Sequence, residues 1–484
     1  MQRMKGLTQT EAEAIYDAGK ERVVEMLMTM SAKLAKIEQQ VEMLEVRLKQ
    51  NSQNSHWPPS RDIDKKPAPK SQRKKTGKPS GGQPGHEGTR LEMAAEPDHV
   101  KEHWPEVCAG CGKTLGQKHA SGYAKRQVHD IPPIEIEVTE HRAIQVCCGG
   151  CGTLSQGAFP TEVTQDVQYG SGIAALATYA NVHQLLPLDR TTELIEDICG
   201  RRISEGTVVN MLEACAEKLA PVESKIKAGV IASTTVNFDE TGLRVVKTGY
   251  WLHVSSTPEL TLYWVDPKRG KKGHDAMGVL AGFRGNAIHD RYEAYLQWPD
   301  CTHGFCNAHL LRDLTGIEEM TGQNWTTQTK ALLSEMNTVV SLAKAAGQTQ
   351  LAQDYLTAFE SRYDQWVRRG LQSNRLPIKE SGKPGKPRAS PARNLAEALR
   401  DHKDKVILFA RNFAVPFDNN LAERDLRMMK VKQKVSGCFR SIVGARTFAT
   451  IRCYVSTARK QGHRAIDALQ AVFDNRDIKL NFAE

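Results

Sequence analysis

The sequence predicts a multidomain α+β protein, and three observations along its 484 residues carry this prediction. A heptad pattern near the N-terminus is followed by a basic, Pro- and Gly-rich stretch and then by two Cys-x-x-Cys pairs. Short apolar runs that end on carboxylates alternate with helical patterns in the second half. Because the composition changes at each step, we expect separate units. They are a coiled coil (20–50), a linker (51–95), a cysteine module (96–165), a helical region (166–228), a sheet-containing domain (229–462) with a helical insertion at about 315–405, and a C-terminal tail (463–484).

Composition places the chain among folded proteins with a basic surface. Hydrophobic residues make up 40% and charged residues 25%, enough for at least one sizeable core. The net charge of +10 favours polyanionic partners, although many basic proteins bind no nucleic acid. The N-terminus lacks the apolar core of a signal peptide, and no run approaches the roughly 20 apolar residues of a membrane span. We therefore expect a cytoplasmic protein without a membrane partner, whose eleven cysteines are thiols or metal ligands and not disulfides.

The N-terminal heptads predict a coiled coil. Apolar residues recur in steps of four and three at Val23, Leu27, Met30, Leu34, Ile37, Val41, Leu44 and Leu48. The alternative is an amphipathic helix packed on its own domain. The linker that follows leaves such a helix little nearby core, so we expect self-association into a homo-oligomer.

The linker at 51–95 contains few large apolar side chains and many Pro, Gly, Ser, Lys and Arg residues. Such a segment cannot bury enough apolar surface to fold alone. A solvated tether is one interpretation. A tether that also contacts phosphates is the other, because its basic residues outnumber its acids.

Two cysteine pairs indicate a structural zinc site. Cys108 and Cys111 form one pair, Cys148 and Cys151 the other, and glycine follows each second cysteine. Four thiolates suit tetrahedral Zn²⁺. Residues 131–146 alternate in polarity like strands and would bring the pairs together. Cys147 could replace Cys148 as a ligand, and free thiols are the alternative to a zinc site.

Residues 173–185, 189–198 and 204–217 read as three helices, with Gly200 in the second turn and Ser204 as an N-cap. Helix, glycine-containing turn and helix is the geometry of a helix-turn-helix DNA reader, although a plain helical linker domain would look the same. The candidate DNA contacts are Arg201, Arg202, Ser204, Thr207 and Asn210.

Acidic side chains end two predicted strands and lie on one predicted helix. The apolar run at 233–238 stops on Asp239 and Glu240, and the run at 285–289 stops on Asp290. The third acid, Glu423, lies on a helix for which residues 418–420 would supply capping side chains. Taken singly, such carboxylates are usually solvated turn residues. Together they are the oxygen ligands that two hard divalent cations need, with positions left for phosphate oxygens and water.

The strands around these acids predict a mixed sheet. Strands at 233–238, 250–255 and 260–265 would form an antiparallel meander, and a helix at 274–280 would return the chain to the strand that ends at Asp290. That strand should lie beside the first, which brings the two aspartates to neighbouring strand ends.

Further basic residues surround the acid positions in the sequence. A strand running into a helix places Cys306 and His309 one turn apart, where we expect them to pack near the acids, since a second zinc site would need more ligands. Residues 315–403 are helical in pattern, with a Pro-, Gly- and Lys-rich interruption at 376–391. Candidate contacts to DNA from these segments and from the Glu423 helix are His309, Arg312, Arg424, Arg427 and Lys430.

Several of these blocks, in this order, resemble the DDE transposases of the insertion-sequence-66 family, the TnpC type. The matching motifs are Phe-Asp-Glu-Thr at Asp239, Asp-Arg-Tyr-Glu-Ala-Tyr at Asp290 and Asp-Asn-Asn-Leu-Ala-Glu-Arg at Glu423, with the Gly-rich block before the cysteines. The resemblance runs from about residue 51 to about 462. It implies a ribonuclease-H-like catalytic domain carrying a helical insertion, with Asp239, Asp290 and Glu423 as the catalytic acids.

The resemblance further implies the activity and the partners. The enzyme would be a Mg²⁺-dependent (or Mn²⁺-dependent) polynucleotidyl transferase that cuts and transfers strands of an insertion sequence and binds its terminal DNA and its target. One cation between Asp239 and Asp290 would activate water and then the freed 3′ hydroxyl, and a second between Asp239 and Glu423 would stabilise the leaving oxygen. Bacterial nucleoid association and small companion proteins of the same element are implied as well. The alternatives are a non-catalytic zinc and helix-turn-helix DNA-binding protein with a decayed nuclease fold, and a structural coiled-coil adaptor.

Overall fold

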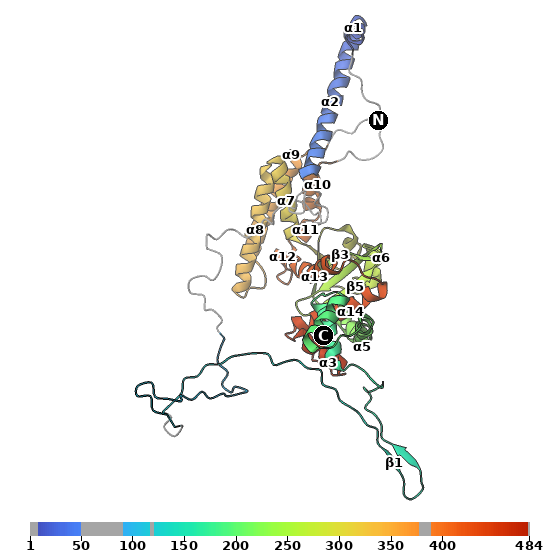
Figure 1. Ribbon diagram of the computed structural model, residues 1–484. Helices are drawn as coiled ribbons and strands as arrows, with labels where there is room; N and C mark the ends of the chain where they lie inside the picture. Colours follow the sequence, from blue (N-terminus) through green and yellow to red (C-terminus); the bar gives the residue numbers. More distant parts are fainter. Residues whose placement is uncertain (1–7, 50–90, 117–120, 377–388, 483–484) are drawn as a thin grey trace.

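The computed structural model describes residues 8–49, 91–116, 121–376 and 389–482 (Figure 1). Most of the predicted linker and most of the interruption at 376–391 lie outside the described residues. The part of the chain that the structure describes contains no helix that is both long and apolar enough to cross a membrane.

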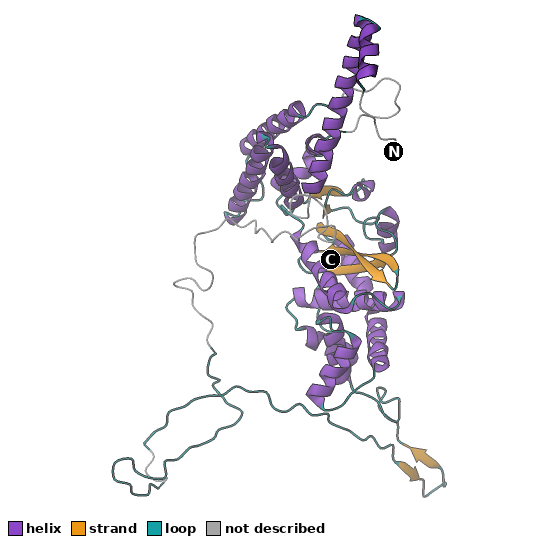
Figure 2. Cartoon of the chain, turned by 45° about the horizontal axis from the view of Figure 1, so that its top comes forward, coloured by secondary structure: helices purple, strands orange, loops and turns teal. Residues whose placement is uncertain are grey.

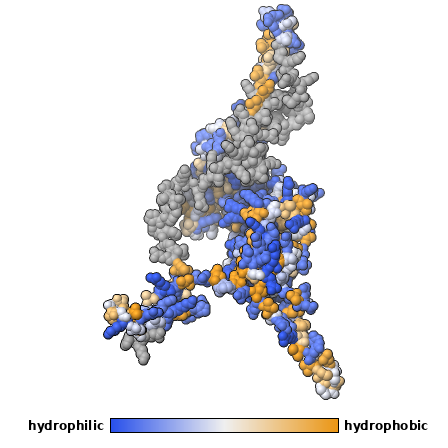
Figure 3. Space-filling model, viewed as in Figure 1, coloured by the Kyte–Doolittle hydropathy of each residue, from blue (hydrophilic) through white to orange (hydrophobic). Residues whose placement is uncertain are grey.

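The N-terminal segment is helical, as the heptads predict. Helix α1 (Gln9–Asp17) begins with a capping box from Thr8, and helix α2 (Lys20–Lys49) is one continuous helix of 30 residues. Its seam residues Leu27, Leu34 and Val41 are 60%, 55% and 48% exposed. Figure 3 shows apolar patches along this helix. An exposed apolar seam is what a coiled-coil partner would cover, and self-association stays a prediction.

The cysteine module has little regular structure. Within its described residues, the strands β1 (Gln145–Cys147) and β2 (Leu154–Gln156) form an antiparallel pair. The prediction of strands throughout 131–146 was therefore wrong, because residues 131–143 have no strand partner in the described part of the chain. Alternating polarity forms a strand only when a neighbouring strand takes up the backbone hydrogen bonds, and Ile131 and Val138 are instead 79% and 82% exposed.

The helical region consists of α3 (Ser171–Thr178), the π-helical turn η3 (Tyr179–His183), α4 (Leu188–Cys199) and α5 (Glu205–Ala232). Helix α4 ends at Gly200, whose φ of 68° is left-handed, and α5 begins at Ser204, whose hydroxyl accepts a hydrogen bond from the Thr207 N–H. Both boundaries confirm the sequence prediction. Ala177, Ile195, Ile203 and Val208 form a small core between these helices.

Helix α5 is longer than predicted. It was expected to end at Glu217, but it continues through Pro221 to Ala232. A proline inside a helix removes a hydrogen bond and costs about 3 kcal/mol. The burial of Ile226 and Val230 in the core shared with the sheet offsets that cost and carries the chain directly to the first strand of the sheet.

A five-stranded mixed sheet lies at the centre of the molecule, with helices on both sides (Figure 2). Its strands are β3 (Thr235–Val245), β4 (Thr248–Ser256), β5 (Thr261–Asp266), β6 (Asn286–His289) and β7 (Thr302–Phe305), in the order β5-β4-β3-β6-β7. The first three are antiparallel, and β6 and β7 run parallel to β3. The predicted meander and the placement of the Asp290 strand beside the first strand are thus confirmed.

Strand β3 does not stop at the carboxylates, as the sequence suggested. It runs six residues past Asp239 to Val245, because β4 pairs with it along its whole second half: Asp239 lies opposite Val254 and Glu240 opposite His253. An antiparallel partner satisfies the backbone of polar residues as well as apolar ones. The change from apolar residues to carboxylates in the sequence therefore coincides with the end of the β3–β6 pairing, and not with the end of β3.

Further helices cover the sheet. Helix α6 (Lys271–Met277), predicted three residues later, contacts β4 and β5, and the 3₁₀ turn η4 (Glu293–Gln297) follows β6. Helix α13 (Asn420–Ser436) lies on β3 and β4, and α14 (Ile442–Lys460) lies on α5 and β5. Helix α15 (Ala465–Phe473) packs on α3, so the region predicted as a tail contributes Ala468 and Leu469 to the main core.

The insertion forms a helical body with its own core (Figure 1). It comprises α7 (Asn307–Thr321), α8 (Asn324–Ala345), α9 (Gln353–Ser373), α10 (Pro391–Asp401), α11 (Lys403–Val406) and α12 (Leu408–Arg411). Ile288 of β6 and Phe305 of β7 belong to this second core. The insertion is therefore anchored to the sheet edge next to Asp290.

Candidate active site

The strand register brings the two aspartates to one level of the sheet. In the parallel β3–β6 pair, Thr235 lies opposite Asn286 and Asn237 opposite Ile288. Two residues further along each strand come Asp239 and Asp290, just past the point where β6 ends. The Asp239 carboxylate accepts a hydrogen bond from the Glu240 N–H at 2.8 Å, and the Asp290 carboxylate accepts one from the Tyr292 N–H at 2.9 Å.

Glu423 reaches the same region because one buried asparagine ties its helix to β3. Asn419 is 1% exposed; its side-chain oxygen accepts from Asn237 Nδ2 and its Nδ2 donates to the Phe238 carbonyl, both at 2.8 Å. The expectation that Asn419 uses its side chain to cap the helix was wrong, since the side chain makes no capping bond. The Asn419 side chain forms its hydrogen bonds with β3, the strand that carries Asp239. These bonds fix the first turn of α13 beside Asp239.

Helix α7 supplies the immediate neighbours of Glu423. His309 Nδ1 and Arg312 Nη2 lie 3.7 Å and 3.8 Å from Glu423 Oε1. Cys306, at the start of α7, accepts a hydrogen bond from the Asn419 N–H at 3.2 Å. The prediction that Cys306 and His309 pack near the acids is confirmed. Arg424, Arg427 and Lys430, the predicted DNA contacts on the glutamate's own helix, are exposed.

Electrostatic repulsion between the carboxylates shifts the pKa of Asp239. Removal from water raises the pKa of Asp239 well above its ordinary 3.8, and the charges of Glu240, Asp290 and Glu423 raise it further. The Lys430 residue as a whole is exposed, but partial desolvation of its ammonium lowers its pKa, and the Asp239 charge opposes that shift. Glu423 is thus near enough to act on Asp239. A site in which negative charge is costly is one that a bound cation stabilises.

The donor atoms of this region fall into two sets. Asp239 and Asp290 offer carboxylate oxygens only, which suits Mg²⁺ or Mn²⁺. Glu423, with Cys306 and His309, belongs to a group whose ligand atoms all lie within 4.8 Å of one another. Its oxygens are hard ligands, but its thiol and imidazole neighbours are softer. Among the described residues, Asp239, Asp290 and Glu423 do not form one such close group. What links the three is the action of the Asp290 and Glu423 charges on Asp239.

Each cysteine pair forms its own turn with the same hydrogen bonds. The Cys108 N–H donates to the Lys113 carbonyl and the Gly112 N–H to the Cys108 carbonyl, at 2.8 and 2.9 Å. The second pair repeats both bonds, and Gly112 and Gly152 share a φ of 73°. Backbone N–H groups of Cys111 and Gly110 lower the pKa of the Cys108 thiol.

The repeat identifies Cys148, not Cys147, as the counterpart of Cys108. Its N–H donates to the Thr153 carbonyl at 2.9 Å, whereas Cys147 is the last residue of β1 and its thiol donates to the Gly152 carbonyl. The structure does not bring Cys108, Cys111, Cys148 and Cys151 together, since no described group of close metal ligands contains them. The four-cysteine zinc site stays a prediction.

The predicted DNA contacts of the helical region lie at one place. Arg201, Arg202 and Asn210 are exposed at the turn and the start of α5. Thr207 is half-buried, and its hydroxyl bonds to that of Ser204 at 2.9 Å, which makes it part of the helix cap. Arg202 also lies 3.3 Å from Glu196. The exposed set is accessible to a phosphate backbone, and Thr207 is the least accessible member.

Comparison with known families agrees with this arrangement. A family model described as the transposase IS66 family matches residues 166–447, more than half of the chain. The chain belongs to the transposase IS66 family. Its role is therefore that of a transposase, and the family indicates DNA as its partner. Residues 5–92 match a second model, described as a family of unknown function (DUF6444). No curated protein matches the chain.

Several residues of this IS66-family transposase escaped sequence reasoning. Glu240, treated only as a companion of Asp239, has a side chain that is 2% exposed; Arg269 Nε donates to it at 2.7 Å and the Tyr295 hydroxyl donates to its other oxygen. Arg269 in turn lies over the rings of Tyr292 and Trp251. The sequence motifs contain Glu240, Tyr292 and Tyr295, so they mark these residues as candidates. Arg269 lies in neither motif, and no sequence pattern points to it.

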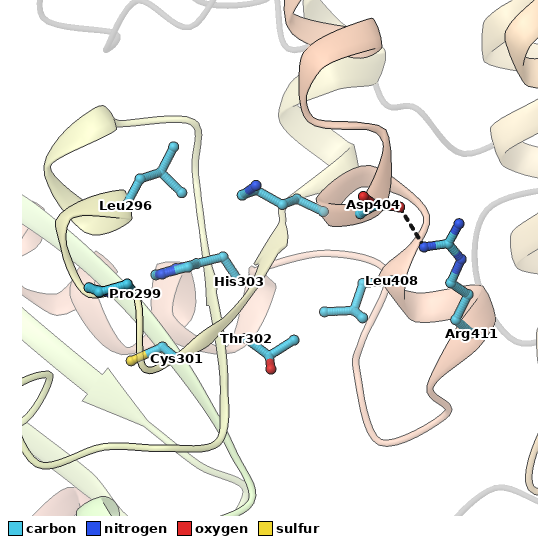
Figure 4. A pocket seen from close by; sticks show the side chains of 9 residues that line it. Leu296, Pro299, Cys301, Thr302, His303, Asp404, Leu408 and Arg411 are labelled. Carbon is cyan, nitrogen blue, oxygen red and sulfur yellow. Dashed lines mark hydrogen bonds and ion pairs between the residues drawn. The ribbon is translucent and has the colours of Figure 1, made fainter.

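A pocket of about 410 Å³ in the transposase lies between η4, β7 and the α11–α12 segment (Figure 4). None of the residues that line it is a predicted site residue. Two of its charged side chains, Asp404 and Arg411, pair with each other at 2.6 Å, and Lys405 also lines it. The pocket therefore adds nothing to the candidate active site.

Proposed function

We propose that this transposase cleaves and joins DNA strands at the ends of an insertion sequence, with Asp239, Asp290 and Glu423 as its catalytic residues. The observation that carries the proposal is the convergence of the three acids. They come from β3, from the end of β6 and from α13, and the charges of Asp290 and Glu423 both act on Asp239. Half-buried carboxylates whose charges raise one another's pKa are costly to gather, and such clusters are typical of functional sites.

The topology of the sheet supports a ribonuclease-H-like catalytic domain. Three antiparallel strands followed by two parallel ones, with the first strand in the middle, form the order β5-β4-β3-β6-β7. This order places the centre of the first strand beside the end of the fourth, where Asp239 and Asp290 lie. The helix that follows the insertion then supplies the third acid.

In the proposed reaction, the chain's own residues position the cations and the strand. A pair of Mg²⁺ ions, when bound, would activate the attacking water or 3′ hydroxyl and stabilise the leaving oxygen. Asp239 and Asp290 hold the site at the strand level set by the β3–β6 register, and Glu423 approaches from α13. His309 and Arg312 lie within 4 Å of Glu423, so they orient this carboxylate and are placed to contact a scissile phosphate.

DNA binding is proposed for the helical region and for the basic face of α13. Arg201, Arg202 and Asn210 are exposed at the start of α5, and Arg424, Arg427 and Lys430 are exposed along α13. Neutralised phosphates would release counterions and make the affinity fall with salt. The two cysteine turns would add a structural Zn²⁺, and small accessory proteins of the same element are further proposed partners.

The test is a Mg²⁺-dependent cleavage and strand-transfer assay on DNA that bears the ends of the element. Asp239→Ala, Asp290→Ala and Glu423→Ala should each abolish cleavage but leave end binding intact. Glu293→Ala removes an exposed carboxylate close to Asp290 and serves as the control, which should stay active. Cleavage by any of the three alanine variants would refute the mechanism. End binding without cleavage by the wild type, with its natural accessory proteins supplied, would favour the non-catalytic DNA-binding alternative.

Self-association through α2 is proposed as a separate property. The double variant Leu34→Glu, Val41→Glu places charges on the exposed apolar seam and should convert the oligomer to a smaller species in sedimentation. Lys33→Glu changes charge beside the seam and should keep the wild-type mass. An unchanged mass in the double variant would contradict the coiled coil.

A further inference from the structure

A second cluster of metal-ligating side chains lies behind the catalytic strand, on the face opposite to Asp239. Side chains alternate along β3, so Asp239 shares a face with Asn237, which bonds to α13, and Glu240 shares the other with Phe238. Glu240 lies directly across from His253 of β4. His274 of α6 completes the group, and the ligand atoms of these three residues lie within 4.8 Å of one another.

His253 is oriented in the way of a metal-binding histidine. Its Nε2 lies 3.0 Å from the Lys268 carbonyl oxygen, which can only accept, so Nε2 carries the proton and Nδ1 keeps a lone pair. That Nδ1 is buried and has no hydrogen-bond partner among the described residues. Ligating histidines usually donate their other N–H to a carbonyl in this way. Gly273 keeps this contact close: a Cβ there would lie 2.2 Å from the Lys268 oxygen and 2.7 Å from His253 Nε2.

His274 is the least satisfied side chain of the cluster. It is 3% exposed, and within the described part of the chain neither of its ring nitrogens has a hydrogen-bond partner. The ring stacks on Tyr295 with centroids 4.6 Å apart and meets His253 edge-on at 5.5 Å. A buried imidazole normally has at least one partner for its polar nitrogens. Stacking fixes the ring but leaves both nitrogens without one.

Two hydrogen-bond donors orient the Glu240 carboxylate, the third ligand candidate of the cluster. Arg269 Nε donates to one of its oxygens at 2.7 Å and the Tyr295 hydroxyl donates to the other. A carboxylate has about four lone-pair sites, so two donors leave capacity for a cation. The donors fix the orientation of the carboxylate, and its position across from His253 sets the distance between them.

We propose that Glu240, His253 and His274 bind one transition-metal ion of the zinc class, separate from the catalytic cations. Two neutral imidazoles and one carboxylate are a ligand set of zinc enzymes, with a fourth position for water. Bound metal would join β3, β4 and α6 directly behind Asp239. The site would brace the catalytic strand and needs no part in strand transfer.

Cobalt substitution tests the site in the full-length protein. Co²⁺ bound by nitrogen and oxygen gives visible d–d absorption without the thiolate-to-cobalt charge-transfer band that cysteine sites produce. We expect the wild type to bind one equivalent of Co²⁺ with the nitrogen and oxygen signature, and His274→Gln and Glu240→Gln each to lose it. Lys272→Ala, on the exposed side of the same helix, should keep it. Equal cobalt stoichiometry and identical spectra in the wild type and both glutamine variants would overturn the proposal.

Hydrogen exchange of the wild type with and without Zn²⁺ keeps the test decisive if the variants fold poorly. Zinc at the proposed site should slow amide exchange in α6 and in β4 around His253. Zinc at the cysteine turns would protect residues 107–114 and 147–154, and zinc at Cys306 and His309 would protect α7. Protection at those other places but none in α6 would overturn the proposal. Neither measurement depends on DNA cleavage, so the proposed function can fail while the metal site stands.

Discussion

Replacing Asp425 should test how firmly the Glu423 helix is fixed to the sheet. Asp425 lies two residues after Glu423 on α13, and one of its oxygens accepts hydrogen bonds from Ser256 at 2.6 Å, Thr261 at 3.2 Å and Lys460 at 2.7 Å. These partners come from β4, β5 and α14. The side chains of Lys460 and Asp425 are only 14% and 16% exposed.

The expected loss of folding stability in Asp425→Ala follows from the Lys460 ammonium, which would stay buried without its carboxylate partner. Asp425→Ala removes the one carboxylate of the pair, while Lys460 keeps only the Thr257 and Leu260 carbonyls as acceptors. Breaking a buried ion pair from one side costs about 3–5 kcal/mol. The double variant Asp425→Leu, Lys460→Met removes both charges and should recover much of that loss, because apolar replacement of both partners is often close to neutral.

Urea unfolding followed by tryptophan fluorescence measures the effect, and the two single variants with the double one form a mutant cycle. Asp275→Ala is the matched control: it breaks a Lys271–Asp275 pair whose side chains are about half exposed, and should cost less than about 1 kcal/mol. Strand cleavage by Asp425→Ala should fall even under conditions where the protein stays folded, since the register of Glu423 is loosened. A destabilisation no larger than that of the control would refute this account of α13.

Three further predictions concern charge, space and ligand identity. Burial raises the pKa of Asp239 above its ordinary 3.8, so the metal-free wild type loses stability as the pH rises through the raised pKa. Asp239→Asn removes this charge and should unfold at a higher temperature than the wild type at neutral pH without Mg²⁺. Equal unfolding temperatures would contradict this prediction. Gly285→Ala places a Cβ 2.5 Å from the Thr234 carbonyl oxygen and should cost about 1–3 kcal/mol in chemical denaturation, whereas Gly242→Ala, with no atom within 4 Å, should be much milder. Cys148→Ser should abolish zinc binding at the cysteine turns in elemental analysis while Cys147→Ser retains it, and the reverse result would assign the ligand to Cys147.

Local sequence patterns predicted a helix or its end correctly where residues within that helix or its cap are sufficient to define it. The end of α4 at Gly200 and the start of α5 at Ser204 follow from one left-handed glycine and one hydroxyl, both readable in the sequence. The three acids were found because they stand in short motifs whose order resembles one family. The continuous helix α2 follows from its heptads.

Pairing across long distances in the sequence was decided only in the tertiary structure. Strand β3 passes through Asp239 to Val245 because β4 pairs with it, and residues 131–143 form no strand because the described chain gives them no partner. The Asn419 side chain connects α13 to β3 and does not cap the helix, because Asn237, 182 residues away, donates a hydrogen bond to its side-chain oxygen. A hydrogen bond or a ladder needs two groups, and the sequence around one of them cannot specify the other.

The different environments of the two carboxylates at residues 239 and 240 also depend on partners that are distant in the sequence. Their motif marks both, but only the alternation of β3 within a paired sheet sends Asp239 toward α13 and Glu240 toward His253, His274 and Arg269. The sequence by itself determined which acids the chain carries and on which elements they stand. The fold decided which cations, histidines and arginines each acid meets, because those partners are brought close only when distant segments pack together.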